Sequence, residues 1–257
     1  MNRLLTILIY GLSGLIGVVA FTYPFLLPVR PSPTLQTSQA PLLTAVLLIL
    51  CLVVLLVEVQ GERISAKIVA TLGVLVAITA VLRFIEVAIP GPGGFTPIFA
   101  PIILAGYVFG ARFGFLMGTL TLLSSALITG GVGVWLPYQM FAAGWVGLTA
   151  GWLPHPRQPQ LEFGLLLLFG FGWGMAYGAL MNLYSWPYLA GDAAISWQSG
   201  RGFADGLQRY AAFYLLTSLI WDLGAAVGNV LLLLLLGRPA LRALIRFRDK
   251  FSFEYVG

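Results

Sequence analysis

Apolar residues fill this chain in runs long enough to cross a lipid bilayer. Each run holds roughly 17 to 25 residues and ends at glycine, proline or charged positions, and about 20 helical residues span the hydrocarbon core. Backbone polar groups inside lipid must bond within their own segment, which favours helices. The pattern therefore predicts an all-α membrane protein of about eight transmembrane helices, over residues 4–27, 42–59, 66–88, 96–111, 113–130, 137–153, 162–189 and 208–236.

The first two runs differ from the other six. Residues 4–27 follow a short basic N-terminus and could be a signal peptide, but their length and the lack of an A-x-A cleavage site favour a retained helix. Residues 42–59 are mostly Leu, Val and Ile, and they follow a proline-rich linker. We expect residues 1–60 to form an appended pair of N-terminal helices and residues 61–257 to form a six-helix membrane core with a basic cytoplasmic tail.

Small residues recur at four-residue spacing in the core helices, which lets helix backbones approach closely in lipid. Three stripes of this kind are Gly110, Gly114 and Gly118; Ala143, Gly147 and Gly151; and Gly170, Gly174 and Gly178. The first core helix carries its own smooth face of Ala66, Ala70, Gly73 and Ala77. Two uses of that face are open. Packing within the chain is the more frequent use of such stripes, and docking of another subunit is the alternative.

Composition excludes several classes of protein. Hydrophobic residues make up 59% of the chain, charged residues only 9%, and the mean hydropathy is +0.94, so the chain is not a soluble domain and has no room for an ATPase. Cys51 is the one cysteine and His155 the one histidine, and neither has the neighbours of a metal site. HExxH, GxSxG and Walker motifs are absent. We expect no enzyme activity, no cofactor and no metal.

The distribution of basic residues sets the orientation. Eight crossings place both termini on one side, and loops on the cytoplasmic side carry more lysine and arginine. With the N-terminus inside, the outer segments 28–41, 84–96, 130–137 and 190–207 or their flanks hold four bases, against ten inside. Both termini are therefore expected to be cytoplasmic. The ten inner bases are Arg3, Arg63, Lys67, Arg112, Arg157, Arg238, Arg242, Arg246, Arg248 and Lys250, and the four outer ones are Arg30, Arg83, Arg201 and Arg209.

The outer connections are rich in glycine and proline, above all 90–97 and 130–137. Irregular backbone near membrane depth persists only where it lines protein or a wet cavity, so these loops predict a cavity mouth. Arg83 and Glu86 stand one helical turn apart, and they either pair with one another or contact a ligand. The aromatic residues of 186–203 form either an interfacial belt or part of the mouth.

Asp222 is an acidic residue inside the last predicted helix, on a face that also carries Ser218 and Asn229. A carboxylate at membrane depth needs a partner, and structural pairing and substrate contact are both open. Asn182 continues the stripe of Gly170, Gly174 and Gly178 and is placed to meet that face. The candidate binding residues are Arg83, Glu86, Phe95, Trp135, Tyr138, Gln139, Asn182, Trp197, Arg201, Arg209 and Asp222.

Three features together resemble a known family: six core helices, an A-x-x-x-A motif at Ala66 and Ala70, and the outer loops Pro-Gly-Pro-Gly-Gly-Phe (90–95) and Gly-Gly-Val-Gly-Val-Trp-Leu-Pro-Tyr-Gln-Met-Phe (130–141). Over roughly residues 64–250 the chain is similar to the substrate-binding S components of energy-coupling factor transporters, and its loops look most like the cobalamin or corrinoid branch. The two N-terminal helices depart from the six-helix pattern.

The resemblance implies a vitamin-uptake subunit of the bacterial inner (plasma) membrane. It implies capture of substrate at the outer face, together with a transmembrane coupling subunit and two ATPase subunits as partners. The alanine motif, extended by Gly73 and Ala77, would dock the coupling subunit. The aromatic loops favour a bulky, partly apolar ligand such as a corrinoid. The alternatives are a self-sufficient secondary transporter or channel, which usually shows inverted repeats or a charged path, and a membrane enzyme acting on lipids.

Overall fold

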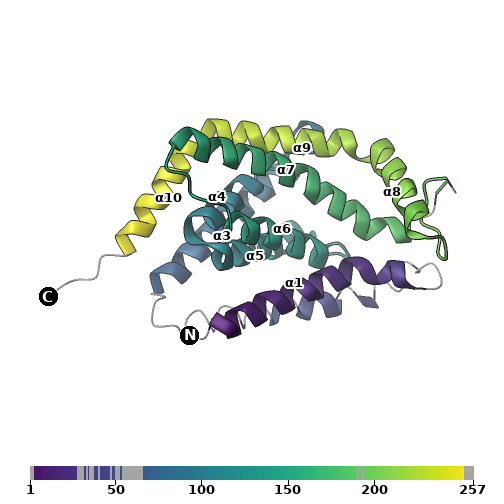
Figure 1. Cartoon of the computed structure of the whole chain (residues 1–257). Helices are drawn as coiled ribbons and strands as arrows, with labels where there is room; N and C mark the ends of the chain where they lie inside the picture. The colour runs from purple at the N-terminus through teal and green to yellow at the C-terminus, as the bar shows by residue number, and fades with distance from the viewer. Residues whose placement is uncertain are drawn as a thin grey trace.

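A computed structural model describes residues 3–27, 66–189, 191–192 and 194–251, together with 32, 34, 38–39, 41–46, 48–49 and 53. The regular secondary structure of these residues is entirely helical (Figure 1). The elements are α1 (Arg3–Leu26), α3 (Ala66–Ala88), η1 (Pro92–Gly94), α4 (Phe99–Phe109), α5 (Ala111–Thr129), α6 (Leu136–Ala150), α7 (Pro159–Ser185), η2 (Trp186–Tyr188), α8 (Phe203–Thr217), α9 (Leu219–Leu232), η3 (Leu233–Gly237) and α10 (Arg238–Phe251).

Several of these helices are apolar enough to lie in a membrane. Four continuous helical stretches have the length and hydropathy of a crossing, and two further apolar stretches are shorter. The expectation of an all-α, multi-pass membrane protein is confirmed, while the predicted second helix, 42–59, lies largely outside the described residues. The long stretches are Lys67–Ala88, Ala111–Thr129, Pro159–Tyr188 and Leu219–Lys250, and the shorter ones are Gly14–Leu26 and Phe99–Phe109.

The last predicted helix, 208–236, is wrong as one continuous span. The chain is already helical from Phe203, inside the predicted loop 190–207, and it breaks at Ser218, whose φ of −132° leaves the α region. The Thr217 hydroxyl bonds back to the Phe213 carbonyl, and the Ser218 hydroxyl bonds across to Asn182, so local side-chain bonds accompany the break. As a result Asp222 lies in the first turn of α9 and not in the middle of a long helix.

Two of the predicted glycine stripes pack against one another where α5 crosses α6. A Cβ added to Gly147 would overlap the carbonyl of Gly114, and one added to Gly118 would overlap the carbonyl of Ala143. Gly106 of α4 approaches the same point, because its added Cβ would also meet Gly147. The stripes therefore serve as packing faces for backbone-to-backbone contact, as their spacing predicts.

The third stripe runs along α7 and packs against α9, which lies beside it in Figure 1. Two of the contacts are hydrogen bonds, from Asn229 Nδ2 to the Gly170 carbonyl at 3.2 Å and from Ser218 Oγ to Asn182 Oδ1 at 3.0 Å. The expectation that Asn182 meets the polar face of the last predicted helix is confirmed. In order along α7, the pairs are Gly170 with Asn229, Gly174 with Ala226, Gly178 with Asp222 and Asn182 with Ser218.

The α3 helix packs on α5 and has a buried and an open side. Leu72, Val76 and Ala80 are buried. Ala70, Gly73 and Ala77 are exposed, and a Cβ added to Gly73 would meet nothing within 4 Å. Within the described residues, therefore, these three positions do not pack against a sibling helix. The side chain of Ala66 lies outside the described residues.

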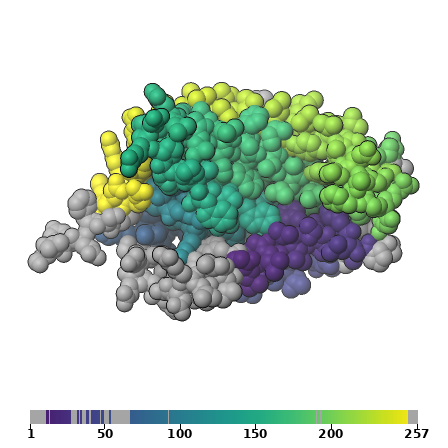
Figure 2. Space-filling view, viewed as in Figure 1, coloured from purple at the N-terminus to yellow at the C-terminus, as the bar shows by residue number. Residues whose placement is uncertain are grey.

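The second half of α1 lies along α6 and α7, seen as the purple band on the core in Figure 2. The Phe21 ring meets Tyr138 edge-on at 5.1 Å, and the hydroxyls of Tyr23 and Tyr188 are 2.7 Å apart. Phe25 packs edge-on against Trp197 at 4.9 Å. The N-terminal helix thus contacts the helices that follow residue 66 directly, and the domain boundary near residue 60 stays a prediction.

Candidate functional site

The helices from α3 to α10 run back and forth, which gives the bundle two distinct ends. One end, here called the loop end, carries the connections 89–98, 130–135 and 186–202. The opposite end, here called the basic end, carries Lys67, Arg112, Arg157 and the bases of α10. Contacts agree with this division, because Arg248 of α10 reaches the Val108 carbonyl at the end of α4.

A cavity of about 330 Å³ lies near the loop end, between α3, α4, α6, α7 and α9. This volume is at the lower end of the range for ligand cavities, roughly 300–1,000 Å³. Its polar lining comes from Arg83, Glu86, Thr96, Gln139, Asn182, Ser218 and Asp222, and much of its apolar lining comes from Ile98, Phe99, Tyr177, Met181 and Trp221. The cavity therefore combines ring and aliphatic surface with a few convergent polar groups, as small-molecule sites do.

Arg83 and Glu86 pair with one another in the wall of this cavity. Arg83 Nη1 lies 2.6 Å from Glu86 Oε1, and the Thr96 hydroxyl donates to Glu86 Oε2 at 2.6 Å. Both carboxylate oxygens are thus engaged, and the charges of Arg83 and Glu86 balance. Because Thr96 comes from the loop after η1, this triad also ties the loop to the end of α3. The pairing that the sequence left open is confirmed.

Asp222 lines the same cavity from α9 and is only 9% exposed. A Cβ on Gly178 would overlap its carboxylate, so glycine at that position of α7 makes room for the charged group. Tyr214 of α8 is close to the carboxylate, and Oδ2 has no hydrogen-bond partner among the described residues. An unpartnered buried acceptor costs about 1–3 kcal/mol, so Asp222 is held here at a cost in stability.

The glycine-rich loop forms the wall of the cavity next to α9. Gly93 and Gly94 have φ values of 61° and 71°, which only glycine adopts readily, and a Cβ on Gly94 would lie 2.9 Å from the Trp221 carbonyl. Phe95 lies directly against Gly228 of α9. Phe95 is one of the predicted binding residues. Its ring packs the loop against α9, and its contact with substrate stays a prediction.

Five of the predicted binding residues, then, come together in one cavity, and the others lie elsewhere near the loop end. Tyr138 is buried in a stack with Tyr184 at 4.3 Å, and Trp135 is exposed, with its indole nitrogen donating to the Gly131 carbonyl at 3.2 Å. Neither lines the cavity. The five that do are Arg83, Glu86, Gln139, Asn182 and Asp222.

Trp197, Arg201 and Arg209 belong to a separate region around α8. Trp197 packs edge-on against Trp186 at 5.5 Å, and its indole nitrogen is buried without a partner in the described part of the chain. Arg209 Nε lies 2.7 Å from Asp205, and Arg201 lies 3.8 Å from the same carboxylate. These residues organise the loop end beside the cavity and do not line it.

Sequence reasoning missed several residues that line the cavity. Thr96 was part of the quoted loop, but nothing in a single threonine predicts its bond to Glu86. Tyr177 and Trp221 lie on apolar helices and give no signal above ordinary lipid-facing or core aromatics. Ser218 is not among the candidate binding residues, although it shares a polar helix face with Asp222. That shared face is the signal in the sequence that points to its place in the cavity.

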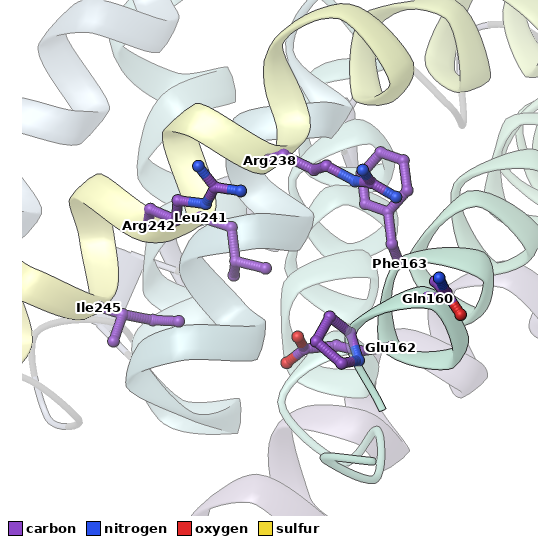
Figure 3. Close-up of a pocket in the computed structure, with 8 residues that line it drawn as sticks. Gln160, Glu162, Phe163, Arg238, Leu241, Arg242 and Ile245 are labelled. Atoms are coloured by element: carbon purple, nitrogen blue, oxygen red, sulfur yellow. The ribbon is translucent and has the colours of Figure 1, made fainter. Parts of the chain in front are cut away.

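A second cavity, of about 290 Å³, lies at the basic end between the start of α7 and α10 (Figure 3). The guanidinium of Arg238 lies over the Phe163 ring, 4.6 Å from its centre, and Glu162 accepts a 2.8 Å hydrogen bond from the Tyr107 hydroxyl. Leu241 and Ile245 supply its apolar side. None of the predicted substrate-binding residues lies here, and the contacts hold α10 against α7.

A multi-pass helical bundle with a small, partly polar cavity near one end has the architecture of a membrane protein that could bind a small molecule. The described residues include no group of His, Cys, Asp or Glu that could hold a metal ion. The family model for the ECF transporter, substrate-specific component, matches residues 67–237, about two thirds of the chain, and the chain belongs to this family. No curated protein and no solved structure matches it.

Membership of this family settles the general role. The chain is a transporter subunit and not an enzyme, and substrate-specific components of this kind work with coupling and ATPase subunits. The resemblance drawn from the alanine motif and the loops is therefore confirmed for the family. The match begins at Lys67, so the N-terminal helices lie outside it.

Proposed function

We propose that this chain captures a small organic molecule in the cavity at the loop end and delivers it across the membrane with a coupling subunit and two ATPases. The observation that carries this is the cavity itself, in which a paired Arg83 and Glu86 and an incompletely bonded Asp222 face apolar rings. A secondary transporter or channel, the alternative, would need a polar path through the bundle, and the polar lining here gathers at one end.

The proposed orientation has the loop end outside and both termini in the cytoplasm. At the basic end lie Lys67, Arg112, Arg157 and the bases of α10, whereas the loop end carries Arg83, Arg201 and Arg209 among the described residues. The bias toward the basic end supports a cytoplasmic position for it. Substrate would then enter the cavity directly from the external side.

The exposed face of α3 is the proposed docking site for the coupling subunit. Ala70, Gly73 and Ala77 leave this side of the helix without bulk, and no described helix covers it. Helices associate in lipid by close backbone approach over such residues. Ala66 extends the same stripe toward the basic end, where a subunit coupled to cytoplasmic ATPases would reach it.

Assembly tests the proposed function directly. The full chain, co-expressed with a coupling subunit and its two ATPases and purified through a tag on this chain, should retain all three partners. Vesicles holding the complex should take up substrate only when ATP is supplied. Uptake by vesicles that hold this chain alone, driven by an ion gradient, would instead support the secondary transporter.

The size of the ligand is the second testable part of the proposal. The loop sequences alone favour a corrinoid, and no comparison supports that choice. A cavity of about 330 Å³, however, suits a molecule at or below the usual size of a drug, and a corrinoid macrocycle is several times larger.

Calorimetric titration of the purified chain with cobalamin, cobinamide, riboflavin, biotin and queuine separates these sizes. We expect sub-micromolar binding of a compound no larger than riboflavin and none of the corrinoids. Sub-micromolar binding of cobalamin or cobinamide would restore the corrinoid hypothesis and would require the loops to open beyond the observed cavity.

A further inference from the structure

The charges around the loop-end cavity do not balance. Arg83 is neutralised by Glu86, whose two oxygens are both engaged, which leaves the carboxylate of Asp222 as the excess charge of the lining. No lysine or arginine among the described residues lies within ion-pairing distance of Asp222, and its Oδ2 atom is buried without a partner. The lining therefore holds one carboxyl group that has no cationic partner in the described part of the chain.

From this imbalance we propose that the substrate carries a cationic nitrogen, such as a protonated amine or an amidinium-like group, that binds Asp222. The inference rests on the proposed function and specifies the chemistry of the substrate. A charged N–H donor in the cavity pairs with the Asp222 carboxylate, which lines it, and balances its charge, a strong arrangement for a buried acid. The rest of the molecule lies against Phe99 and Tyr177, whose rings pack together at 4.6 Å.

The arrangement around Asp222 is built to hold a charge facing the cavity. Gly178 leaves space for the carboxylate, and the neutral Tyr214 is its neighbour on α8. The side chain of Gln139, across the cavity, makes no hydrogen bond within the described part of the chain and is open to a polar group of the substrate. Ser218 and Asn182 bond to one another and are already satisfied.

The charged residues of the cavity lining also disfavour an anionic substrate. A carboxylate or phosphate in the cavity would face Asp222 and Glu86, and the one arginine in the lining is already paired. Like charges in a partly desolvated site repel strongly. Biotin, which bears a carboxylate, is therefore a less suitable ligand than an amine of similar size.

Pairs of ligands that differ in charge test whether the substrate is cationic. Pyridoxamine and pyridoxine differ only in an amine against a hydroxyl, and thiamine and queuine add two larger cations. In calorimetric titrations of the purified full chain, we expect at least one cation-bearing compound to bind, and pyridoxamine to bind about 10–100-fold more tightly than pyridoxine if that scaffold fits. Failure of all three cation-bearing compounds to bind overturns the inference.

Substitutions at Asp222 and at a control position test whether Asp222 binds the cationic group. Asp222→Asn keeps the shape and removes the charge, and it should weaken binding of the cationic compound about 10–100-fold while leaving the affinity for a neutral analogue unchanged. Asp205→Asn is the control, because Asp205 pairs with Arg209 outside the cavity. If Asp222→Asn weakens the cationic and the neutral compound equally, Asp222 is structural and the inference is overturned.

Failure of the inference and failure of the proposed function look different. Sub-micromolar binding of biotin or riboflavin, with no response to any cation-bearing compound, overturns the inference and leaves the chain a substrate-capture subunit. If no compound binds and the chain also fails to retain the coupling subunit and ATPases, the proposed function itself is overturned.

Discussion

Tryptophan at positions 70 and 77 of α3 should abolish substrate uptake by the assembled transporter and leave ligand binding to the isolated chain unchanged. Both native alanines are exposed on a face that no described helix covers, so the added rings cost the isolated chain little. A partner helix that approaches over Ala70, Gly73 and Ala77 could not accommodate them. The loop-end cavity is lined from α3 only by Arg83 and Glu86, beyond these positions.

The measurement compares ATP-driven uptake in vesicles, retention of the coupling subunit during purification, and ligand affinity of the isolated chain. Gly164→Trp combined with Gly172→Trp is the matched control, because these α7 positions are also exposed and an added Cβ meets nothing within 4 Å. The control should keep uptake. If Ala70→Trp with Ala77→Trp lowers ligand affinity as much as uptake, the face belongs to the fold of the chain and the docking proposal fails.

This face shows what a sequence pattern leaves undecided. All the small-residue stripes have the same sequence pattern, because four-residue spacing indicates only that one side of a helix lacks bulky side chains. In the structure, the stripes of α5, α6 and α7 pack against neighbouring helices, whereas Ala70, Gly73 and Ala77 remain open. The difference depends on which helices become neighbours, and no local pattern contains that information.

The candidate site was predictable where polar groups lie on apolar helices. Arg83, Glu86, Asn182 and Asp222 stood out because charged or amide groups at membrane depth need partners, and all four line the cavity. The loop aromatics were harder to interpret. From the sequence alone, Trp135 and Trp197 could lie at the membrane interface, stack on other rings or contact a ligand. The structure places neither in the cavity lining.

The break at Ser218 explains the largest error in the predicted fold. Hydropathy through 208–236 is nearly continuous and the span holds no proline, so the sequence predicts one helix. The hydrogen bond from Ser218 to Asn182 is a tertiary contact, and the one from Thr217 to the Phe213 carbonyl is local. Hydropathy contains no information about either bond. The break brings Asp222 into the first turn of α9, within reach of the cavity and of Tyr214.

Alanine at position 147 should strongly destabilise the chain, although it adds only one methyl group. That methyl would overlap the carbonyl group of Gly114, and it would lie 2.8 Å from the Gly114 Cα atom, where no flexible side chain can move aside. The α5 and α6 backbones would have to separate, which also loosens the approach of α4 at Gly106. Overpacking of a core costs about 1–3 kcal/mol and more where backbone must shift, so we expect the upper part of that range.

Thermal unfolding in detergent and ligand titration together measure this effect. Gly147→Ala should lower the melting temperature strongly and abolish ligand binding, while Gly73→Ala, in open space on α3, should leave both unchanged. Gly114→Ala approaches the same contact from the opposite helix, where its methyl would overlap the Gly147 carbonyl. Because both substitutions separate the same two backbones, the double variant should be much less destabilised than the sum of the two. Additive losses, or a stable Gly147→Ala variant, would contradict the close α5–α6 crossing on which the position of the cavity depends.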